Sequence, residues 1–261
     1  MAQKISRVSV WNIRRAFKKF GNDALKDRTC GRPVEQLNPR FCKIVVKNWQ
    51  EQRCGARKLH VILRRKGYGV SLRKISKVMV ANGFQKPCIK RRKPRKYRRY
   101  EWPLPNLMWH TDWYELDDGQ WLIPYIDDCT RRIMSCGVFE HATTRNALTV
   151  LYKAIADNGV VPLYLNSDRG TQFYANTRDK KGNAKHEFEQ ALEMLGIDFR
   201  PSRPRHPQTN GKNERWNGIV AREYDDRFRS IDHFVRWYNS KRVSEAIDYQ
   251  TPDDKYRRMT K

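Results

Sequence analysis

The part of the sequence that follows Pro103 repeats short apolar patterns that only a layered domain of strands and helices can bury. Three strand patterns come in quick succession, LMWHTDWYEL, WLIPYIDD and RRIMSCGVFEH, joined by short turns. A helical pattern then runs from Thr144 to about Asn158, and strand VPLYLNSD, helix HEFEQALEMLG, strand IDFRPS and a long helix follow it. This order predicts an α/β (α+β) fold with a mixed five-stranded sheet.

The positive charge of the chain is concentrated in its first part. The 261 residues carry 54 Lys and Arg against 28 Asp and Glu, and the whole excess lies in residues 1–100, which hold 30 cations and 4 acids. Such a one-sided field attracts a polyanion, and nucleic acid gains affinity because each neutralised phosphate releases counterions. No apolar run approaches the roughly 18 residues of a spanning helix, so we expect a cytoplasmic DNA-binding protein without membrane contact. A highly charged, merely solvated surface is the alternative.

The first helical pattern covers residues 6–21, with Ser6 as its cap and Gly21 at its end. It resembles the second half of a helix-turn-helix, because the chain starts almost at the turn. We therefore assign residues 1–30 to a partial helix-turn-helix.

Residues 38–85 hold three more helical stretches, separated before the last one by the turn Gly67-Tyr-Gly69 and a cap at Ser71. This pattern is typical of a helix-turn-helix or three-helix DNA-binding domain. The last helix carries the cations that we expect to contact DNA, Arg73, Lys74 and Lys77. An ordinary three-helix bundle with solvated cations is the alternative.

A basic segment links these helices to the sheet domain. Residues 86–100, KPCIKRRKPRKYRRY, hold nine cations and no acid. Like charges and proline keep such a run extended, so residues 86–102 are predicted to form an arm that tracks a phosphate backbone, with a plain linker as the alternative. The candidate contacts at its centre are Arg91, Arg92 and Lys93.

Three acids of the sheet domain are candidates for one site. Asp112 lies in the first strand, Asp168 at the carboxyl end of the fourth, and Glu214 in the first turns of the helix after the fifth. Converging carboxylates repel unless a cation lies between them, and Mg²⁺ prefers such oxygen ligands. The alternative is that the acids only serve turns, a strand end and a helix dipole.

The sequences around these acids resemble a known family. HTDWYEL, NSDRGTQF and HPQTNGKNERWNG, in this order, are similar to the three motifs of the DDE integrase core that insertion-sequence transposases and retroviral integrases share. The resemblance covers about residues 103–252 and leaves 253–261 as a tail. It implies a ribonuclease-H-like domain in which Asp112, Asp168 and Glu214 are catalytic and hold two Mg²⁺ or Mn²⁺ ions. It also places Lys212 where it would meet DNA phosphate.

The sequence departs from the family pattern between the second and third acids. Asp168 and Glu214 are separated by 45 residues, more than the usual spacing, and the polar stretch of residues 175–184 accounts for the excess as a surface loop. Among nearby polar residues, His110 is expected either to touch substrate or to be structural. Asp127 and Asp128 close the second strand and are left out of the predicted catalytic set.

The resemblance implies a transposase or integrase of a prokaryotic insertion sequence. Such a protein would bind double-stranded DNA at the element ends and at the target, cut and join strands by metal-dependent transfer, work as a homo-oligomer and associate with the nucleoid when bound. Two alternatives remain: a truncated or decayed transposase that only binds DNA, and a metal-dependent nuclease of the same fold.

Overall fold

The structure, a computed structural model, describes residues 5–26, 36–86, 101–175, 177, 186–202 and 211–261. Its contacts divide the chain into a short N-terminal unit, residues 1–39, and a larger unit, residues 40–261.

The N-terminal unit contains helix α1 (Arg7–Phe20), followed by the 3-10 helix η1 (Gly21–Leu25). The expected bounds are confirmed: the Ser6 hydroxyl accepts the backbone N–H of Ser9, and Gly21 ends the helix with φ +56°. None of the residues of α1 is buried. Its apolar side chains are therefore exposed, among them those of Val8, Trp11, Ile13, Phe17 and Phe20.

Three helices follow, as the sequence predicted: α2 (Pro39–Gln52), α3 (Ala56–Arg65) and α4 (Leu72–Ala81). Each of them contributes to a small core, whose buried apolar residues are Val45, Ala56, Leu59, Leu63, Ile75, Val78 and Met79. The Ser71 hydroxyl accepts the backbone N–H of Lys74 and caps α4. The structure thus contains three helices in this region, whereas their assignment to a DNA-binding domain stays a prediction.

The described residues of the sheet domain form a mixed sheet of six strands. The strands are β1 (Met108–Thr111), β2 (Tyr114–Glu115), β3 (Trp121–Asp127), β4 (Ile133–Phe139), β5 (Tyr164–Asn166) and β6 (Asp198–Phe199). β3 pairs antiparallel with β1, β2 and β4, while β5 pairs parallel with both β1 and β6.

The expected number of five strands was wrong, because the first predicted strand is interrupted. β1 and β2 pair with the same partner strand in one continuous register, Thr111 with Tyr125 and Tyr114 with Leu122. The two residues between them, Asp112 and Trp113, belong to neither strand. An apolar pattern cannot reveal such a break, because the alternation of side chains continues across it.

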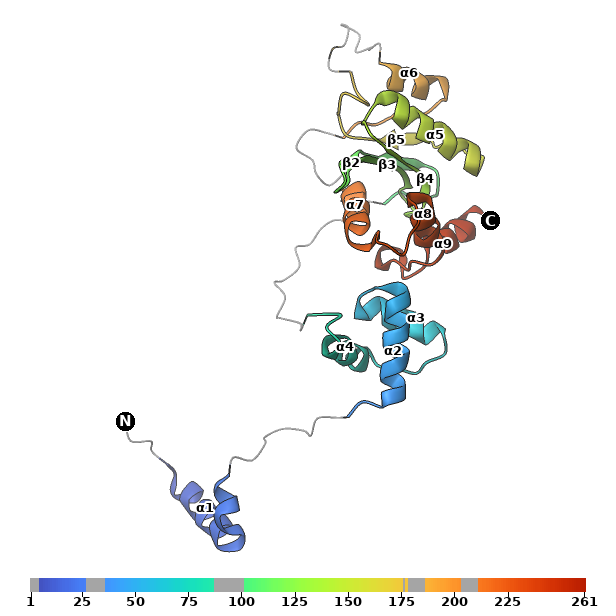
Figure 1. Ribbon diagram of the computed structural model, residues 1–261. Coiled ribbons are helices and arrows are strands. Elements are labelled where there is room, and N and C mark those ends of the chain that lie inside the picture. The colour runs from blue at the N-terminus through green and yellow to red at the C-terminus, as the bar shows by residue number, and fades with distance from the viewer. Residues whose placement is uncertain (1–4, 27–35, 87–100, 176, 178–185, 203–210) are drawn as a thin grey trace. The chain divides into compact units, whose positions relative to one another are not determined.

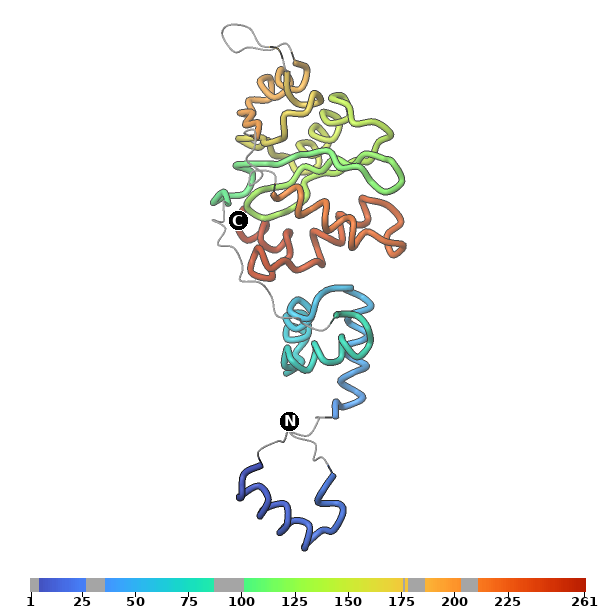
Figure 2. Tube along the Cα trace, turned by 90° about the vertical axis from the view of Figure 1, so that its left-hand side faces the viewer, coloured from blue at the N-terminus to red at the C-terminus, as the bar shows by residue number. Residues whose placement is uncertain are grey.

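Helices cover both faces of the sheet (Figure 1). Helices α5 (Thr144–Asn158) and α6 (Glu187–Met194) lie on one face. Helices α7 (Gly211–Glu223) and α8 (Ile231–Ser240) lie on the other, and the orange-to-red trace of Figure 2 shows the C-terminal helices on that side.

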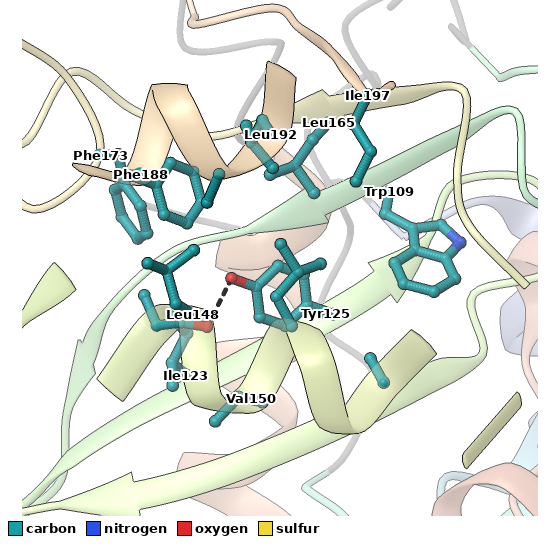
Figure 3. Packing of buried hydrophobic residues seen from close by; sticks show 14 of the residues in the cluster. Trp109, Ile123, Tyr125, Leu148, Val150, Leu165, Phe173, Phe188, Leu192 and Ile197 are labelled. Atoms are coloured by element: carbon teal, nitrogen blue, oxygen red, sulfur yellow. Dashed lines mark hydrogen bonds between the residues drawn. The ribbon is translucent and has the colours of Figure 1, made fainter. Parts of the chain in front are cut away.

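Strand β3 separates two apolar cores by pointing alternate side chains to opposite faces. Ile123 and Tyr125 pack with α5 and α6, whereas Leu122 and Ile126 pack with α7 and α8. Figure 3 shows the first core, in which the Tyr125 hydroxyl donates a hydrogen bond of 2.9 Å to the Ala147 carbonyl. Both faces of the sheet are therefore buried, and polar chemistry is left to its edges.

The 3-10 helix η2 (Glu245–Ile247) follows α8, and the segment of residues 253–261 that was expected to be a tail lies almost entirely in helix α9 (Pro252–Thr260). Asp253 accepts a hydrogen bond of 2.9 Å from Arg132, and Lys255 donates to the carbonyl of Cys129. Residues 253–260 thus belong to the packed sheet domain. Among the residues that the structure describes, no helix has the length and apolarity to cross a membrane.

Candidate active site

Asp112 and Asp168 follow two neighbouring parallel strands at the same level. β1 and β5 are paired up to His110 and Asn166, and each aspartate comes two residues after its strand's member of that pair. Both side chains are half-buried. The carboxyl ends of parallel strands meet at one edge of a sheet, where α/β proteins place ligand-binding groups. The sheet therefore brings these two predicted site residues to one edge.

Gly170 shapes the loop that carries Asp168. Its backbone N–H donates a hydrogen bond of 2.9 Å to Asp168 Oδ1. A Cβ atom at this position would lie 3.0 Å from Asp168 Oδ1 and 2.8 Å from Gln172 Oε1. A side chain at this position would press against Asp168 Oδ1, which favours glycine in the DRG sequence after β5.

Helix α7 begins at the same edge, because a buried amide ties it to β1. Asn213 is fully buried, and its Nδ2 donates a hydrogen bond of 3.0 Å to the carbonyl of Thr111. Asp112 follows Thr111 directly and Glu214 follows Asn213, so this bond connects the two residues that precede the acids. Trp216 is buried in the second core and packs the helix against the sheet. The Glu214 side chain itself is exposed.

The three acids supply the donor type that hard divalent cations prefer, since carboxylate oxygens are the usual protein ligands of Mg²⁺. Across the described ranges, however, no three His, Cys, Asp or Glu side chains are grouped closely enough to hold a metal ion. The structure thus places Asp112 and Asp168 at one edge, with the start of α7 beside Asp112, but it does not group their carboxylates with that of Glu214.

Asp128, which the sequence prediction left out of the catalytic set, is a buried carboxylate next to this edge. Asp128 has no exposed surface, and its Oδ1 lies 2.6 Å from His110 Nε2. Its Oδ2 accepts the backbone N–H of Trp102 at 2.7 Å, and Lys212 Nζ forms an ion pair with Oδ1. Burial alone would raise the pKa of Asp128, but His110 and Lys212 together lower it to about 2. Two adjacent acids at the end of an apolar strand were the available signal, because a buried charge needs partners.

His110 and Asp127 both make contacts inside the sheet domain. His110 is buried, which lowers its pKa, and its Nδ1 lies 3.2 Å from Asn166 Oδ1. Asp127 accepts the backbone N–H and the hydroxyl of Thr130, as expected of an acid that caps a turn. Burial raises the pKa of Asp127. The exclusion of Asp127 and Asp128 from the catalytic set stays a prediction.

The predicted DNA contacts fall into three groups. Arg73, Lys74 and Lys77 are exposed on α4, opposite its buried residues. Lys212 is partly buried, with 13% of its side chain exposed, and it pairs with Asp128. The remaining ones, Arg91, Arg92 and Lys93, lie outside the described residues, as does most of the polar stretch of residues 175–184. All of these DNA contacts stay predictions.

The strand order defines the class of the domain. Three antiparallel strands continue into two parallel ones, with helices on both faces and two acids at the carboxyl edge, which is the ribonuclease-H-like arrangement that the motifs implied. Two family models described as "Integrase core domain" match residues 103–207 and 195–252, and together they span this domain. Through these residues, the chain belongs to the integrase core domain family.

A curated relative bears a related name. "Putative integrase ORF3" of Spiroplasma virus SpV1-C74 is 26% identical over 154 residues, which make up 53% of this chain. The match covers 42% of the relative's own length, so it spans less than half of that protein.

Several solved structures from retroviruses are similar. A chain of the simian T-cell lymphotropic virus intasome, in complex with PP2A regulatory subunit B56 gamma, is 19% identical with a TM-score of 0.48, and the match covers 80% of this chain and 73% of that one. The HTLV-2 integrase catalytic core domain in complex with magnesium is 21% identical with a TM-score of 0.44, covering 58% and 97%. The BIV integrase catalytic core domain is 18% identical with a TM-score of 0.46, covering 59% and 95%.

Proposed function

We propose that this chain is a DDE-type transposase or integrase, which cuts and joins DNA strands by polynucleotidyl transfer. The observation that carries the proposal is the placement of Asp112 and Asp168 beyond two adjacent parallel strands of an integrase core domain. The hydrogen bond from Asn213 to Thr111 supports Glu214 as the third member, because it holds the start of α7 beside Asp112.

In this proposal, Asp112, Asp168 and Glu214 hold two Mg²⁺ or Mn²⁺ ions. When bound, such ions activate the attacking hydroxyl and stabilise the leaving oxygen of an in-line displacement at phosphorus. The protein's own part is to fix the carboxylates: Gly170 N–H orients Asp168, and Asn213 fixes the backbone beside Glu214. Removing any of the three carboxylates should abolish both cutting and joining.

The DNA is proposed to be double-stranded, comprising element ends and a target. The exposed cations of α4 are candidates for phosphate contacts, with the basic arm of residues 86–102 as a second group. Joining two ends requires at least two copies of the active site to meet, so we propose a homo-oligomer on DNA. We further propose a prokaryotic insertion sequence as the source, and a cytoplasmic, nucleoid-associated protein.

The test is a strand-transfer reaction. Purified protein, Mn²⁺ or Mg²⁺, a plasmid target and labelled DNA with the ends of the encoding element are combined, and joined product is measured. Asp112→Asn is compared with Asp117→Asn, an exposed turn acid of the same domain. Joining by the wild type and by Asp117→Asn, but not by Asp112→Asn, supports the proposal.

Two other outcomes would replace it. Metal-dependent cutting without any joining would identify a nuclease of the same fold. DNA binding without cutting, equal in all three proteins, would identify a DNA-binding remnant.

A further inference from the structure

A buried ion pair connects the helix that bears Glu214 to the sheet that bears Asp112. Asp128, which directly follows β3, pairs through Oδ1 with Lys212 Nζ, and Lys212 precedes Glu214 by two residues. The same oxygen lies 2.6 Å from His110 Nε2, and His110 precedes Asp112 by two residues. The Asp128 carboxylate therefore contacts one residue close to Asp112 and one residue close to Glu214 in the sequence.

The surroundings of Asp128 show that it is held in one place. Its side chain is fully buried, and donors from three parts of the chain surround it: His110 on β1, Lys212 on α7 and the backbone N–H of Trp102. Arg131 adds a more distant charge, 3.8 Å from Oδ2. Removing a charged partner from a buried carboxylate lowers stability, because the remaining charge is left unpaired. Asp128 therefore holds its partners in place, as they hold Asp128.

We propose that Asp128 and Lys212 are positioning residues, whose ion pair fixes the first turn of α7 against β1 and so sets how Glu214 meets Asp112. The catalytic meaning of this role rests on the proposed function. The role differs from the phosphate contact that the sequence predicted for Lys212. A lysine whose ammonium group is paired with a buried carboxylate is poorly placed to bind DNA phosphate as well.

A matched control lies at the other end of the same helix. Glu223, the last residue of α7, accepts two hydrogen bonds from the Arg242 guanidinium, at 2.6 and 2.8 Å. Glu223→Gln therefore weakens a partly buried ion pair of α7 that is nine residues away from Glu214. Loss of either ion pair would loosen the helix in general. Only loss of the Asp128–Lys212 pair, at the start of the helix, would also disturb the position of Glu214.

The first test is hydrogen exchange of the full chain, measured by mass spectrometry without DNA. Lys212→Met should speed exchange in peptides covering residues 211–216 and 108–113, while Glu223→Gln should speed it near the end of α7. Asp128→Asn, which keeps an acceptor for the Trp102 N–H, should give the same pattern as Lys212→Met. The double variant should exchange no faster than the faster of the two single variants, since both single changes remove the same ion pair. Unchanged exchange at residues 211–216 in folded Lys212→Met would overturn the proposal.

The second test is the binding of Mn²⁺, followed by electron paramagnetic resonance, together with the Mn²⁺ dependence of strand joining. Residues that orient metal ligands typically change metal affinity by about tenfold or more. Lys212→Met should raise the half-saturating Mn²⁺ concentration by about that factor, with joining restored at high Mn²⁺, and Lys212→Arg should restore most of the affinity. Glu223→Gln should leave the Mn²⁺ dependence unchanged.

DNA affinity separates the two roles of Lys212. A loss of DNA binding in Lys212→Met, with Mn²⁺ affinity and exchange as in the wild type, would make this lysine a phosphate contact and overturn the positioning role. If the wild type joins no DNA at all, the proposed function fails, but exchange still decides whether the ion pair holds the start of α7.

Discussion

Asp112 and Asp168 occupy matching positions after two parallel strands. His110 of β1 is paired with Asn166 of β5, and each aspartate follows its strand's member of that pair by two residues. Two carboxylates that lie close together repel each other, which would favour a bound cation between them. Proteins commonly accept such repulsion at functional sites.

Asp168→Asn should therefore lose the response to metal without losing stability. The unfolding midpoint in chelator should equal or exceed that of the wild type, because one of two like charges is removed. Mn²⁺ should raise the midpoint of the wild type and of Asp117→Asn, but not of Asp168→Asn. Thermal unfolding with and without Mn²⁺ measures this, and an equal Mn²⁺ shift in all three proteins would argue against a metal at this edge.

Gly170→Ala should impair the site by displacing the Asp168 carboxylate. The new methyl group would lie 3.0 Å from Asp168 Oδ1 and 2.8 Å from Gln172 Oε1. We expect strand joining to fall sharply while the unfolding midpoint changes little, since the loop is near the surface. Gly170→Ala with Gln172→Ala should stay defective, because the contact with Asp168 remains; recovery would show that Gln172 alone was the obstacle.

Trp216→Ala should destabilise the sheet domain by about 3–5 kcal/mol, the usual range for a buried aromatic side chain. Trp216 is 2% exposed and lies 4.7 Å, between ring centroids, from Tyr238. The same change at Trp11, which is 58% exposed, should cost far less. Urea unfolding of both variants gives the comparison, and similar losses would contradict the assigned core.

The Glu223–Arg242 pair should make stability depend on acidity. Burial by itself would raise the pKa of Glu223, but the hydrogen bonds and charge of Arg242 outweigh it and hold the pKa below its ordinary value of 4.5. A carboxylate with a lowered pKa stabilises the fold above its unfolded pKa, and this contribution disappears as pH falls. The wild type should therefore be more stable than Glu223→Gln near neutral pH, with the difference shrinking below about pH 4.5. A difference that stays constant from pH 7 to 3 would exclude this linkage.

Much of the fold could be predicted because periodicity and capping are local. The helix of residues 144–158 has the predicted bounds, with the Thr143 hydroxyl accepting the N–H of Asn146 at its start and Gly159 in the left-handed conformation at its end. Helix α9 was missed although its signal is present: Thr251 caps it, Pro252 is its first residue and acids occupy its first turn.

The site was predicted only in part, because its geometry depends on contacts between distant segments. Asp112 and Asp168 were predicted from the motifs, and the register of β1 with β5 shows that they follow neighbouring strands at the same level. No local pattern shows that Lys212 pairs with a carboxylate 84 positions earlier in the chain, Asp128. The break of the first strand at Asp112 was equally hidden, because the strand resumes in the same register.

The most direct test concerns Glu214, whose side chain is exposed and whose carboxylate does not form a group of three with those of Asp112 and Asp168 among the described residues. The measurement is the rate of strand joining by Glu214→Gln beside the wild type, at saturating Mn²⁺ and equal DNA occupancy. The account predicts that the variant binds DNA normally and forms no joined product. Joining at the wild-type rate would contradict the three-acid site and, with it, the proposed function.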